Sequence, residues 1–275
     1  MPELPEVETV RARLEPKLVN RRLERVEIFD TRLTRPFEPA GVAAELEGET
    51  IAVLERRGKY LVVRFESGRV LLIHLRMTGQ LLHANGESLP PNDPHRRAVV
   101  RLDVGSDVIY RDIRRFGTWL LVEPDELDPY LGQRVGREPL APTFTARQLS
   151  AALQGRRAPI KAVLLDQRRL AGIGNIYADE ALWRARVHPL RPAGDLDDQE
   201  ARALHRGIRA ALKGGIARQG ATLSTYRTPD GGSGRMQDEF KVYGRAGEPC
   251  ERCGTPIEKI RAAGRGTWYC PSCQS

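Results

Sequence analysis

Two Cys-x-x-Cys pairs near the carboxyl terminus constrain the fold of this 275-residue chain more than any other feature. Cys250 and Cys253 form the first pair, Cys270 and Cys273 form the second, and sixteen residues separate the pairs. This spacing is typical of a four-thiolate zinc site. Because four thiolates complete the tetrahedron and leave no position for water, we expect one structural Zn²⁺.

Disulfide pairing is the alternative for these four residues, which are all the cysteines of the chain. Disulfides require an oxidising compartment, and the first residues do not resemble a secretion signal, since an apolar region is missing and acidic residues begin at Glu3. No apolar run approaches the length of a membrane span. Zinc in a reducing compartment is therefore the favoured interpretation.

Charge indicates the kind of partner. The chain carries 44 Lys and Arg against 36 Asp and Glu, a formal net charge of +8. Residues 241–275 have six basic and three acidic side chains, and the segment between the cysteine pairs, with Arg261, Arg265 and Trp268, is of the kind that a β-hairpin presents. A polyanion such as DNA fits this distribution better than a small acid.

Hydrophobic periodicity divides the rest of the chain into two parts. Short apolar runs punctuated by glycines predict a β-sandwich or barrel after a first helix that begins at Pro5. The expected strands are Leu23–Phe29, Thr50–Leu54, Tyr60–Phe65, Val70–Leu75, Ala98–Val104, Val108–Arg111 and Trp119–Val122. Residues 123–143 are rich in Pro, Asp and Gly and have the composition of a linker.

Beyond residue 143 the period becomes helical. Thr145 and Gln148 form a capping box, and helices are expected at about Pro159–Asp166, Asn175–Arg186 and Asp197–Arg218. The glycine turn at 170–175 offers backbone N–H groups to a phosphate or is ordinary turn chemistry. The loop at 228–234 is either a lid over a substrate or an exposed linker.

The amino terminus offers a nucleophile. Removal of Met1 exposes the secondary amine of Pro2, whose pKa near ~7.7 to 8.0 leaves a useful unprotonated fraction at neutral pH. Attack on a sugar carbon gives an iminium ion, and Glu3 is the neighbouring proton carrier. The alternative is a plain helix start, with Glu6 and Glu8 complementing the helix dipole and with a buried stripe of Val7, Val10, Leu14 and Leu18.

Six motifs together resemble the bacterial formamidopyrimidine-DNA glycosylases, which remove 8-oxoguanine and also act as AP lyases. They are PELPEVET at 2–9, RGKY at 57–60, IHLRMTG at 73–79, RRFG at 114–117, GIGNIYADE at 172–180 and the final cysteines. The resemblance implies an α+β fold in which an N-terminal β-sandwich with a leading helix precedes a helix-two-turn-helix domain and a β-hairpin zinc finger. The expected domains are 1–130 (catalytic), 131–144 (linker), 145–235 (helix-two-turn-helix) and 236–275 (zinc finger).

The resemblance also implies roles for particular residues. Pro2 attacks C1′ of a flipped nucleotide, and Glu3 protonates the ring oxygen. Lys59 assists proton transfer during elimination, and Arg265 grips the phosphates that flank the lesion. Contacts to the DNA backbone or site are implied for His74, His95, Arg114, Arg156 and Asn175.

Met77 and Phe116 are implied to wedge into the duplex while Arg114 pairs with the widowed cytosine. His74 lies on an apolar strand, so a hydrogen-bonded core histidine is an equal alternative there. Arg76 is a departure, because many relatives have glycine before the methionine. We expect damaged duplex DNA as partner, a monomer, and the bacterial cytoplasm as location. The alternatives are an endonuclease VIII-type enzyme for oxidised pyrimidines, against which Leu4 argues, and a non-catalytic DNA-binding protein.

Overall fold

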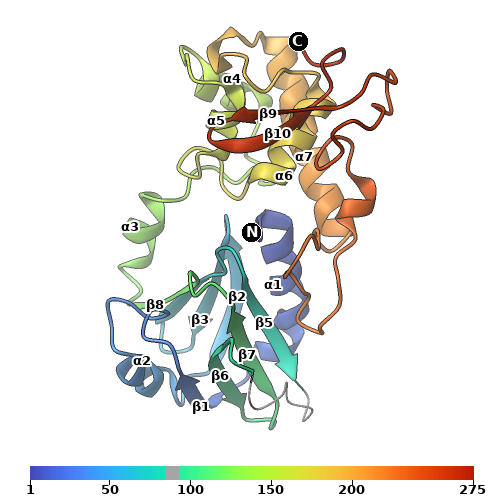
Figure 1. The fold of residues 1–275 in the computed structure, drawn as a ribbon. Coiled ribbons are helices and arrows are strands. Elements are labelled where there is room, and N and C mark those ends of the chain that lie inside the picture. Colours follow the sequence, from blue (N-terminus) through green and yellow to red (C-terminus); the bar gives the residue numbers. More distant parts are fainter. Residues whose placement is uncertain (85–92) are drawn as a thin grey trace. The chain divides into compact units, whose positions relative to one another are not determined.

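The computed structural model describes residues 1–84 and 93–275, which form two compact units. The N-terminal unit comprises Met1–Leu131 and Arg218–Arg235, and the C-terminal unit comprises Gly132–Ala217 and Met236–Ser275 (Figure 1). Residues 218–235 thus group with the N-terminal unit, whereas the sequence analysis assigned them to the helical domain. The expected domain boundaries remain a prediction.

The N-terminal unit is the expected β-sandwich with a leading helix. Two antiparallel four-stranded sheets have the strand orders β1-β6-β7-β5 and β2-β3-β4-β8. The elements are α1 (Leu4–Leu18), β1 (Leu23–Ile28), α2 (Pro39–Leu46), β2 (Ile51–Arg57), β3 (Tyr60–Phe65), β4 (Val70–His74), β5 (Gly79–Ala84), β6 (Arg96–Leu102), β7 (Asp107–Asp112), β8 (Thr118–Val122) and α3 (Leu127–Gly132).

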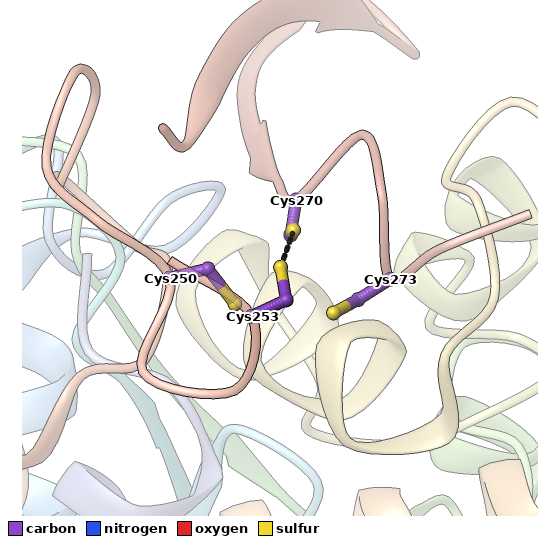
Figure 2. Close-up of side chains that lie close together, drawn as sticks. All are labelled: Cys250, Cys253, Cys270 and Cys273. Atoms are coloured by element: carbon purple, nitrogen blue, oxygen red, sulfur yellow. Dashed lines mark hydrogen bonds between the residues drawn. The ribbon is translucent and has the colours of Figure 1, made fainter. Parts of the chain in front are cut away.

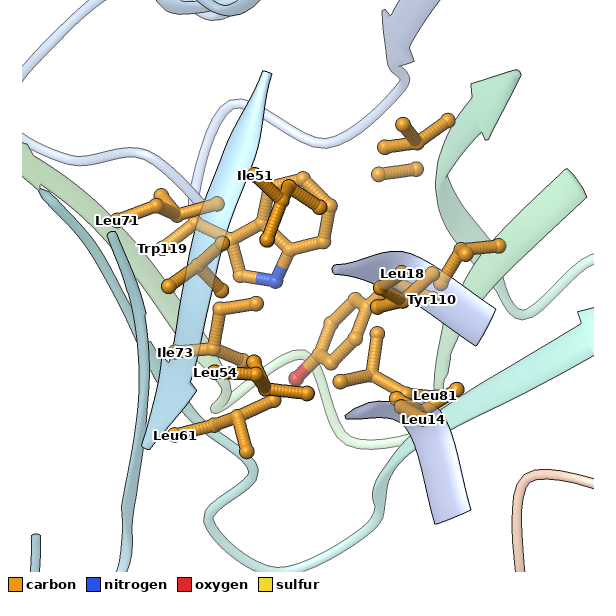
Figure 3. Close-up of a cluster of buried hydrophobic side chains, with 14 of the residues drawn as sticks. Leu14, Leu18, Ile51, Leu54, Leu61, Leu71, Ile73, Leu81, Tyr110 and Trp119 are labelled. Carbon is orange, nitrogen blue, oxygen red and sulfur yellow. The ribbon is translucent and has the colours of Figure 1, made fainter. Parts of the chain in front are cut away.

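One core fills the space between the two sheets and helix α1. Tyr110 of β7 and Trp119 of β8 lie 5.5 Å apart between ring centroids, among aliphatic side chains from both sheets (Figure 3). Helix α1 contributes the buried stripe expected from its period, which consists of Val7, Val10, Leu14 and Leu18. Burial of this stripe anchors the amino-terminal end of the chain on the sandwich.

Three elements of this unit were not expected from the sequence. Strand β5 contains Gly79 and Gln80 and no β-branched residue, so its strand signal is weak. Helix α2 has only eight residues and buries only Val42 and Leu46. Helix α3 occupies the start of the stretch 123–143, whose composition indicates a linker.

The C-terminal unit consists of helices followed by a two-stranded hairpin, which completes the expected α+β fold. The Thr145–Gln148 capping box is present, with both hydrogen bonds between 3.3 and 3.4 Å. Within residues 1–84 and 93–275, no helix has the length and apolar character that a membrane crossing requires. The elements are α4 (Ala146–Leu153), α5 (Ile160–Leu165), α6 (Asn175–Ala185), η1 (Ala193–Asp195), α7 (Asp198–Ala217), η2 (Met236–Glu239), β9 (Glu258–Ala262) and β10 (Arg265–Tyr269).

The loop at 228–234 is fastened to the N-terminal unit. Asp230 forms ion pairs with Arg13 and Lys17 of helix α1. The His83 N–H of β5 donates to the Pro229 carbonyl at 2.8 Å. The loop therefore lies against the same helix that carries the amino terminus, which is a more specific placement than an exposed linker.

Candidate active site and nucleic-acid interface

Pro2 and Glu3 are buried at the start of helix α1, and Glu6 fixes the backbone there. The Glu3 N–H donates to Glu6 Oε2 at 2.8 Å, and Glu6 Oε1 accepts the Ala221 N–H at 2.8 Å. Glu6 is only 2% exposed. A carboxylate that accepts two backbone N–H groups is held firmly, so Glu6 positions the Pro2–Glu3 segment against residue 221.

Glu6 is a residue that the sequence analysis missed, because it was assigned only to the helix dipole. The spacing Glu3-x-x-Glu6 was the available signal, since it matches a capping box. Gly220 is required beside this carboxylate, because its φ is +80° and a Cβ there would lie 2.7 Å from Glu6 Cγ. Tyr226 donates to the Gln219 carbonyl at 3.1 Å, and burial raises the pKa of its phenol.

Lys59 occupies a two-residue turn between β2 and β3. Its side chain is 5% exposed, and Gly58 before it has a φ of 59°. Arg56 ties this turn to helix α1, since it donates to the Gly58 carbonyl at 3.0 Å and to Glu8 Oε2 at 3.0 Å. The amine of Lys59 is thus presented by a turn whose backbone is fixed.

His74 is a buried, hydrogen-bonded histidine at the end of β4. The Arg76 N–H donates to His74 Nδ1 at 3.0 Å, and the Tyr60 ring meets the imidazole edge-to-face at 4.7 Å. Burial, with the nearby charges of Arg76 and Lys59, lowers the pKa of His74 to about 3. The ring is therefore neutral at pH 7 and carries its hydrogen on Nε2. Contact with DNA through this nitrogen remains a prediction.

Met77, Arg114 and Phe116 lie on two neighbouring connections at one end of the sandwich. Met77 is half-buried in the turn between β4 and β5, whereas Arg114 and Phe116 are exposed between β7 and β8. The Arg114 guanidinium lies over the Phe116 ring at 4.7 Å from the centroid. An exposed phenylalanine capped by an arginine is suited to contact flat, electron-rich partners such as bases.

Arg76 adopts the left-handed conformation, with a φ of 51°. This region favours glycine, because a Cβ crowds the backbone there. The Arg76 side chain is exposed next to Met77 and keeps its charge on the surface.

His95 and Arg156 lie on separate units. His95 is half-buried at the start of β6, and its Nδ1 is buried without a hydrogen-bond partner among the described residues. Arg156 follows helix α4 in the C-terminal unit, where its Nε donates to the Ala152 carbonyl at 2.6 Å. Their contacts with DNA remain predictions.

Asn175 and Arg265 are brought together in the C-terminal unit. Asn175 begins helix α6, and its side-chain amide donates to the Gly266 carbonyl at 2.9 Å. Arg265 precedes Gly266 and is exposed, at the end of the tight turn formed by Ala263 and Gly264, both of which have positive φ. Two groups suited to phosphate binding therefore lie on adjoining elements.

A buried ion pair supports this hairpin and was not foreseen. Lys161 of α5 and Asp179 of α6 are both fully buried, with 2.6 Å between Nζ and Oδ1. Lys161 also donates to Thr267 Oγ1 at 2.7 Å, and the Trp268 N–H donates to Asp179 Oδ2 at 3.1 Å. Burial raises the pKa of Asp179 to about 7, and the neighbouring Lys161 ammonium only partly opposes this shift. The sequence signal was a Lys and an Asp within apolar helical runs.

Glu180 is a third missed carboxylate. It is fully buried, and its Oε1 accepts the backbone N–H groups of Lys241, Val242 and Tyr243 at 2.9 to 3.2 Å. Its other oxygen pairs with Arg184 at 2.7 Å. Glu180 therefore fixes the chain where it enters the cysteine-containing module.

The glycine turn before helix α6 is organised by a side chain. Gln167 accepts the Gly172 N–H at 2.9 Å and donates to the Ile173 carbonyl at 2.7 Å. Gly172 has a φ of 81°. The Gly172 N–H is thus already engaged, and phosphate binding by this turn remains a prediction.

The four cysteines form one cluster whose geometry fits a zinc ion. The ligand atoms of Cys250, Cys253, Cys270 and Cys273 all lie within 4.8 Å of one another (Figure 2). Tetrahedral Zn–S bonds of ~2.3 Å place sulfurs about 3.8 Å apart. The Sγ atoms of Cys253 and Cys270 lie 3.5 Å apart, far beyond the ~2.05 Å S–S bond of a disulfide. The Trp183 indole N–H donates to Cys250 Sγ at 3.4 Å and supports a thiolate there.

A sandwich that buries a Pro–Glu pair at its amino terminus, combined with a helical unit and a four-cysteine hairpin, defines the class of zinc-finger DNA glycosylases. Residues 1–119 match the formamidopyrimidine-DNA glycosylase N-terminal domain, residues 135–227 match its H2TH domain, and residues 247–275 match the zinc finger found in FPG and IleRS. The chain belongs to the formamidopyrimidine-DNA glycosylase family.

Individual relatives extend this similarity over the full length. The formamidopyrimidine-DNA glycosylase of Symbiobacterium thermophilum is 49% identical to this chain. The aligned region covers 100% of this chain and 89% of that relative. A mutant FPG from Lactococcus lactis in complex with Fapy-dG-containing DNA has a TM-score of 0.93 at 38% identity, covering 100% of both chains. The wild-type Lactococcus lactis protein with oxidised-pyrimidine-containing DNA has a TM-score of 0.91 at 38% identity, again over both whole chains.

Proposed function

We propose that this chain excises oxidised purines, both 8-oxoguanine and formamidopyrimidines, from duplex DNA and then cuts the abasic strand, with Pro2 as the nucleophile. The observation that carries the proposal is the buried Pro2–Glu3 segment held by Glu6 in a chain of this family. A fixed amine next to a carboxylate supplies a nucleophile and a proton carrier at one point.

The chemistry follows from the amine. After loss of Met1, the Pro2 nitrogen attacks C1′, the glycosidic bond breaks, and the base leaves with the bonding electrons. Glu3 protonates the ring oxygen, so the sugar opens to an iminium ion. The iminium acidifies the C2′ hydrogens, and β-elimination expels the 3′ phosphate. δ-Elimination then expels the 5′ phosphate, which leaves a gap with phosphates at both ends.

The remaining residues bind and orient the DNA. Lys59 lies at a fixed turn and assists proton transfer, while Arg265 grips the flanking phosphates through its planar fork of donors. Met77 and Phe116 fill the space left by the flipped base, and Arg114 faces the widowed cytosine. His74, His95, Arg156 and Asn175 are the further residues proposed to contact the DNA, either at its backbone or in the site. The zinc ion organises the hairpin and takes no part in the reaction.

An oxidised-pyrimidine activity is a second candidate for the same site. The complex of the Lactococcus lactis protein with oxidised-pyrimidine-containing DNA supports some tolerance for such lesions in a relative. Leu4, where the endonuclease VIII branch usually has glycine, and the full set Met77, Arg114 and Phe116 favour purines as the main substrates. Action as a monomer in the bacterial cytoplasm completes the proposal.

Borohydride trapping on duplexes tests the proposal directly. Untagged protein should form a covalent adduct with DNA carrying 8-oxoguanine opposite cytosine, and Pro2→Gly, which replaces the secondary amine with a primary one, should form far less while still binding DNA. A tag that blocks the Pro2 amine is the matched control and should act like Pro2→Gly. Trapping only on an oxidised-pyrimidine duplex would favour the second candidate, and no adduct on either duplex would mean a non-catalytic protein.

A further inference from the structure

The Met77 turn (residues 75–78) and the Arg114 loop (residues 113–117) adjoin two residues that pair with each other across strands β5 and β7. Gly79, the first residue of β5, pairs with Asp112, the last residue of β7. The turn therefore ends, and the loop begins, at neighbouring backbone positions. Any group that bridges this point links the two connections.

Asp112 is such a group. Its carboxylate is 1% exposed and accepts hydrogen bonds from both connections. Oδ2 accepts the N–H groups of Phe116 at 3.0 Å and Gly117 at 2.8 Å, and Oδ1 accepts the Arg114 N–H at 3.2 Å. The Thr78 hydroxyl also donates to Oδ1. One carboxylate thus holds the backbone of the loop and reaches the turn.

Thr78 closes the link from the other side. Its hydroxyl donates to Asp112 and accepts the Arg114 N–H at 3.0 Å. Thr78 directly follows Met77, so a single side chain joins the residue after the methionine to the backbone of the arginine. This bridge is local, and removing the hydroxyl leaves the bonds from Asp112 to the loop in place.

The far side of the Arg114 loop is also fixed. Arg115 has a φ of 58° and makes a two-point pair with Asp30, at 2.6 and 2.8 Å. A Cβ on Gly117 would lie 1.7 Å from the Tyr110 hydroxyl, so only glycine fits. The backbone is therefore held at both ends, while Phe116 remains 49% exposed.

We propose that Asp112 and Thr78 are positioning residues that join Met77, Arg114 and Phe116 into one rigid element for reading the base opposite the lesion. The proposal rests on the function proposed above. Recognition by an arginine depends on the direction of its planar fork of donors. A displacement of ~1 Å in a supporting residue is enough to degrade such a site.

Thr78→Val tests the link, because valine keeps the shape of threonine without its hydroxyl. The measured quantity is the preference in kcat/KM for 8-oxoguanine opposite cytosine over 8-oxoguanine opposite adenine. The variant removes the hydrogen bond to Asp112 and the one from the Arg114 N–H, which keeps its bond to Asp112, so the preference should fall by about fivefold. Cleavage of a single-stranded abasic site, which has no opposite base, should keep its rate. Thr78→Ser restores the hydroxyl and should restore the preference.

Thr34→Val is the matched control, because it removes the hydroxyl of a different threonine in the same unit, which is buried and donates to the Phe37 carbonyl at 3.0 Å. It should leave the preference unchanged. Asp112→Asn should lower the preference further, with melting temperature measured alongside. An unchanged preference in Thr78→Val, or an equal loss of single-strand cleavage, overturns the positioning role. A wild-type protein that excises no oxidised purine overturns the proposed function itself.

Discussion

Arg114 and Arg265 both lie exposed at short β-connections, yet the two regions hold them by different means. Around Arg114, the Asp112 carboxylate accepts several backbone hydrogen bonds from the loop itself. Around Arg265, the buried Lys161–Asp179 pair supports the strand, and four cysteines gather at its far end. The first arrangement spreads its stability over bonds of about 1 kcal/mol each. The arrangement around Arg265 concentrates its stability in a few groups, so a single substitution there should lower stability more than one around Arg114.

The largest effect should come from the cysteines. Cys270→Ser should release zinc and abolish tight DNA binding, because structural zinc sites contribute ~10 to 16 kcal/mol of binding energy to folding. Zinc content and protease sensitivity of residues 236–275 would measure it. Ser272→Ala, which removes only an exposed hydroxyl near Thr255, is the control and should retain zinc. Full zinc binding and DNA affinity in Cys270→Ser would show that the region around Arg265 does not depend on a few groups.

Next is the buried ion pair. Lys161→Met should lower the free energy of unfolding by about 3 to 5 kcal/mol, because the Asp179 carboxylate loses its buried partner and must either stay unpaired or take up a proton. The double variant Lys161→Met with Asp179→Asn should recover much of this loss, since asparagine still accepts the Trp268 N–H. Urea unfolding at pH 7 measures both. A double variant as unstable as the single one would show that packing, and not charge, decides stability at this site.

A smaller effect in the N-terminal unit depends on pH. The pKa of His74 is lowered to about 3 in the folded state, so the unfolded chain binds more protons below pH 6.5. Stability should therefore be complete above pH 6.5 and fall as the pH decreases. The expected loss is about 2 kcal/mol between pH 6.5 and 5.

His74→Asn sharpens this prediction, because asparagine still accepts the Arg76 N–H but does not titrate. Urea unfolding of both proteins at pH 7 and pH 5 isolates the histidine contribution. The wild-type protein should lose about 2 kcal/mol more than the variant. Equal losses in the two proteins would show that other groups cause the acid sensitivity.

The smallest effect concerns Arg76. Arg76→Gly should raise the free energy of unfolding by up to about 1 kcal/mol, because glycine adopts the left-handed conformation without a Cβ clash. Arg76→Ala keeps the Cβ and should show no such gain. Thermal melts of the three proteins suffice. A gain in the alanine variant equal to that in the glycine variant would trace the effect to the lost charge instead.

The sequence predicted those parts whose signals are local. The buried stripe of helix α1, the Thr145 capping box and the cysteine cluster follow from spacing alone, and the structure contains all three. Strand β5 was not foreseen, because its residues pair through their backbone with β7 and carry little strand propensity. Because β5 is short and its pairing partner lies elsewhere in the chain, its own sequence contains no signal that predicts a strand.

The supporting residues of the site were harder to predict for a related reason. Glu6, Asp179 and Glu180 are charged, and a charged residue in a sequence is most often exposed. Each is buried here because it accepts backbone N–H groups supplied by segments that folding brings to it. Their roles depend on partners distant in the chain, and this information is absent from the local pattern.

The bond from the Ala221 N–H to Glu6 spans 215 residues and has a consequence for how the protein is made. A ribosome releases the first helix long before it has synthesised residue 221, and domains generally fold in that order. Throughout that interval, the Ala221 N–H that donates to the Glu6 carboxylate does not yet exist. The end of the chain that carries the proposed nucleophile Pro2 is therefore translated first but gains its full hydrogen bonding late, and a chain truncated before residue 221 lacks the bond that fixes Glu6.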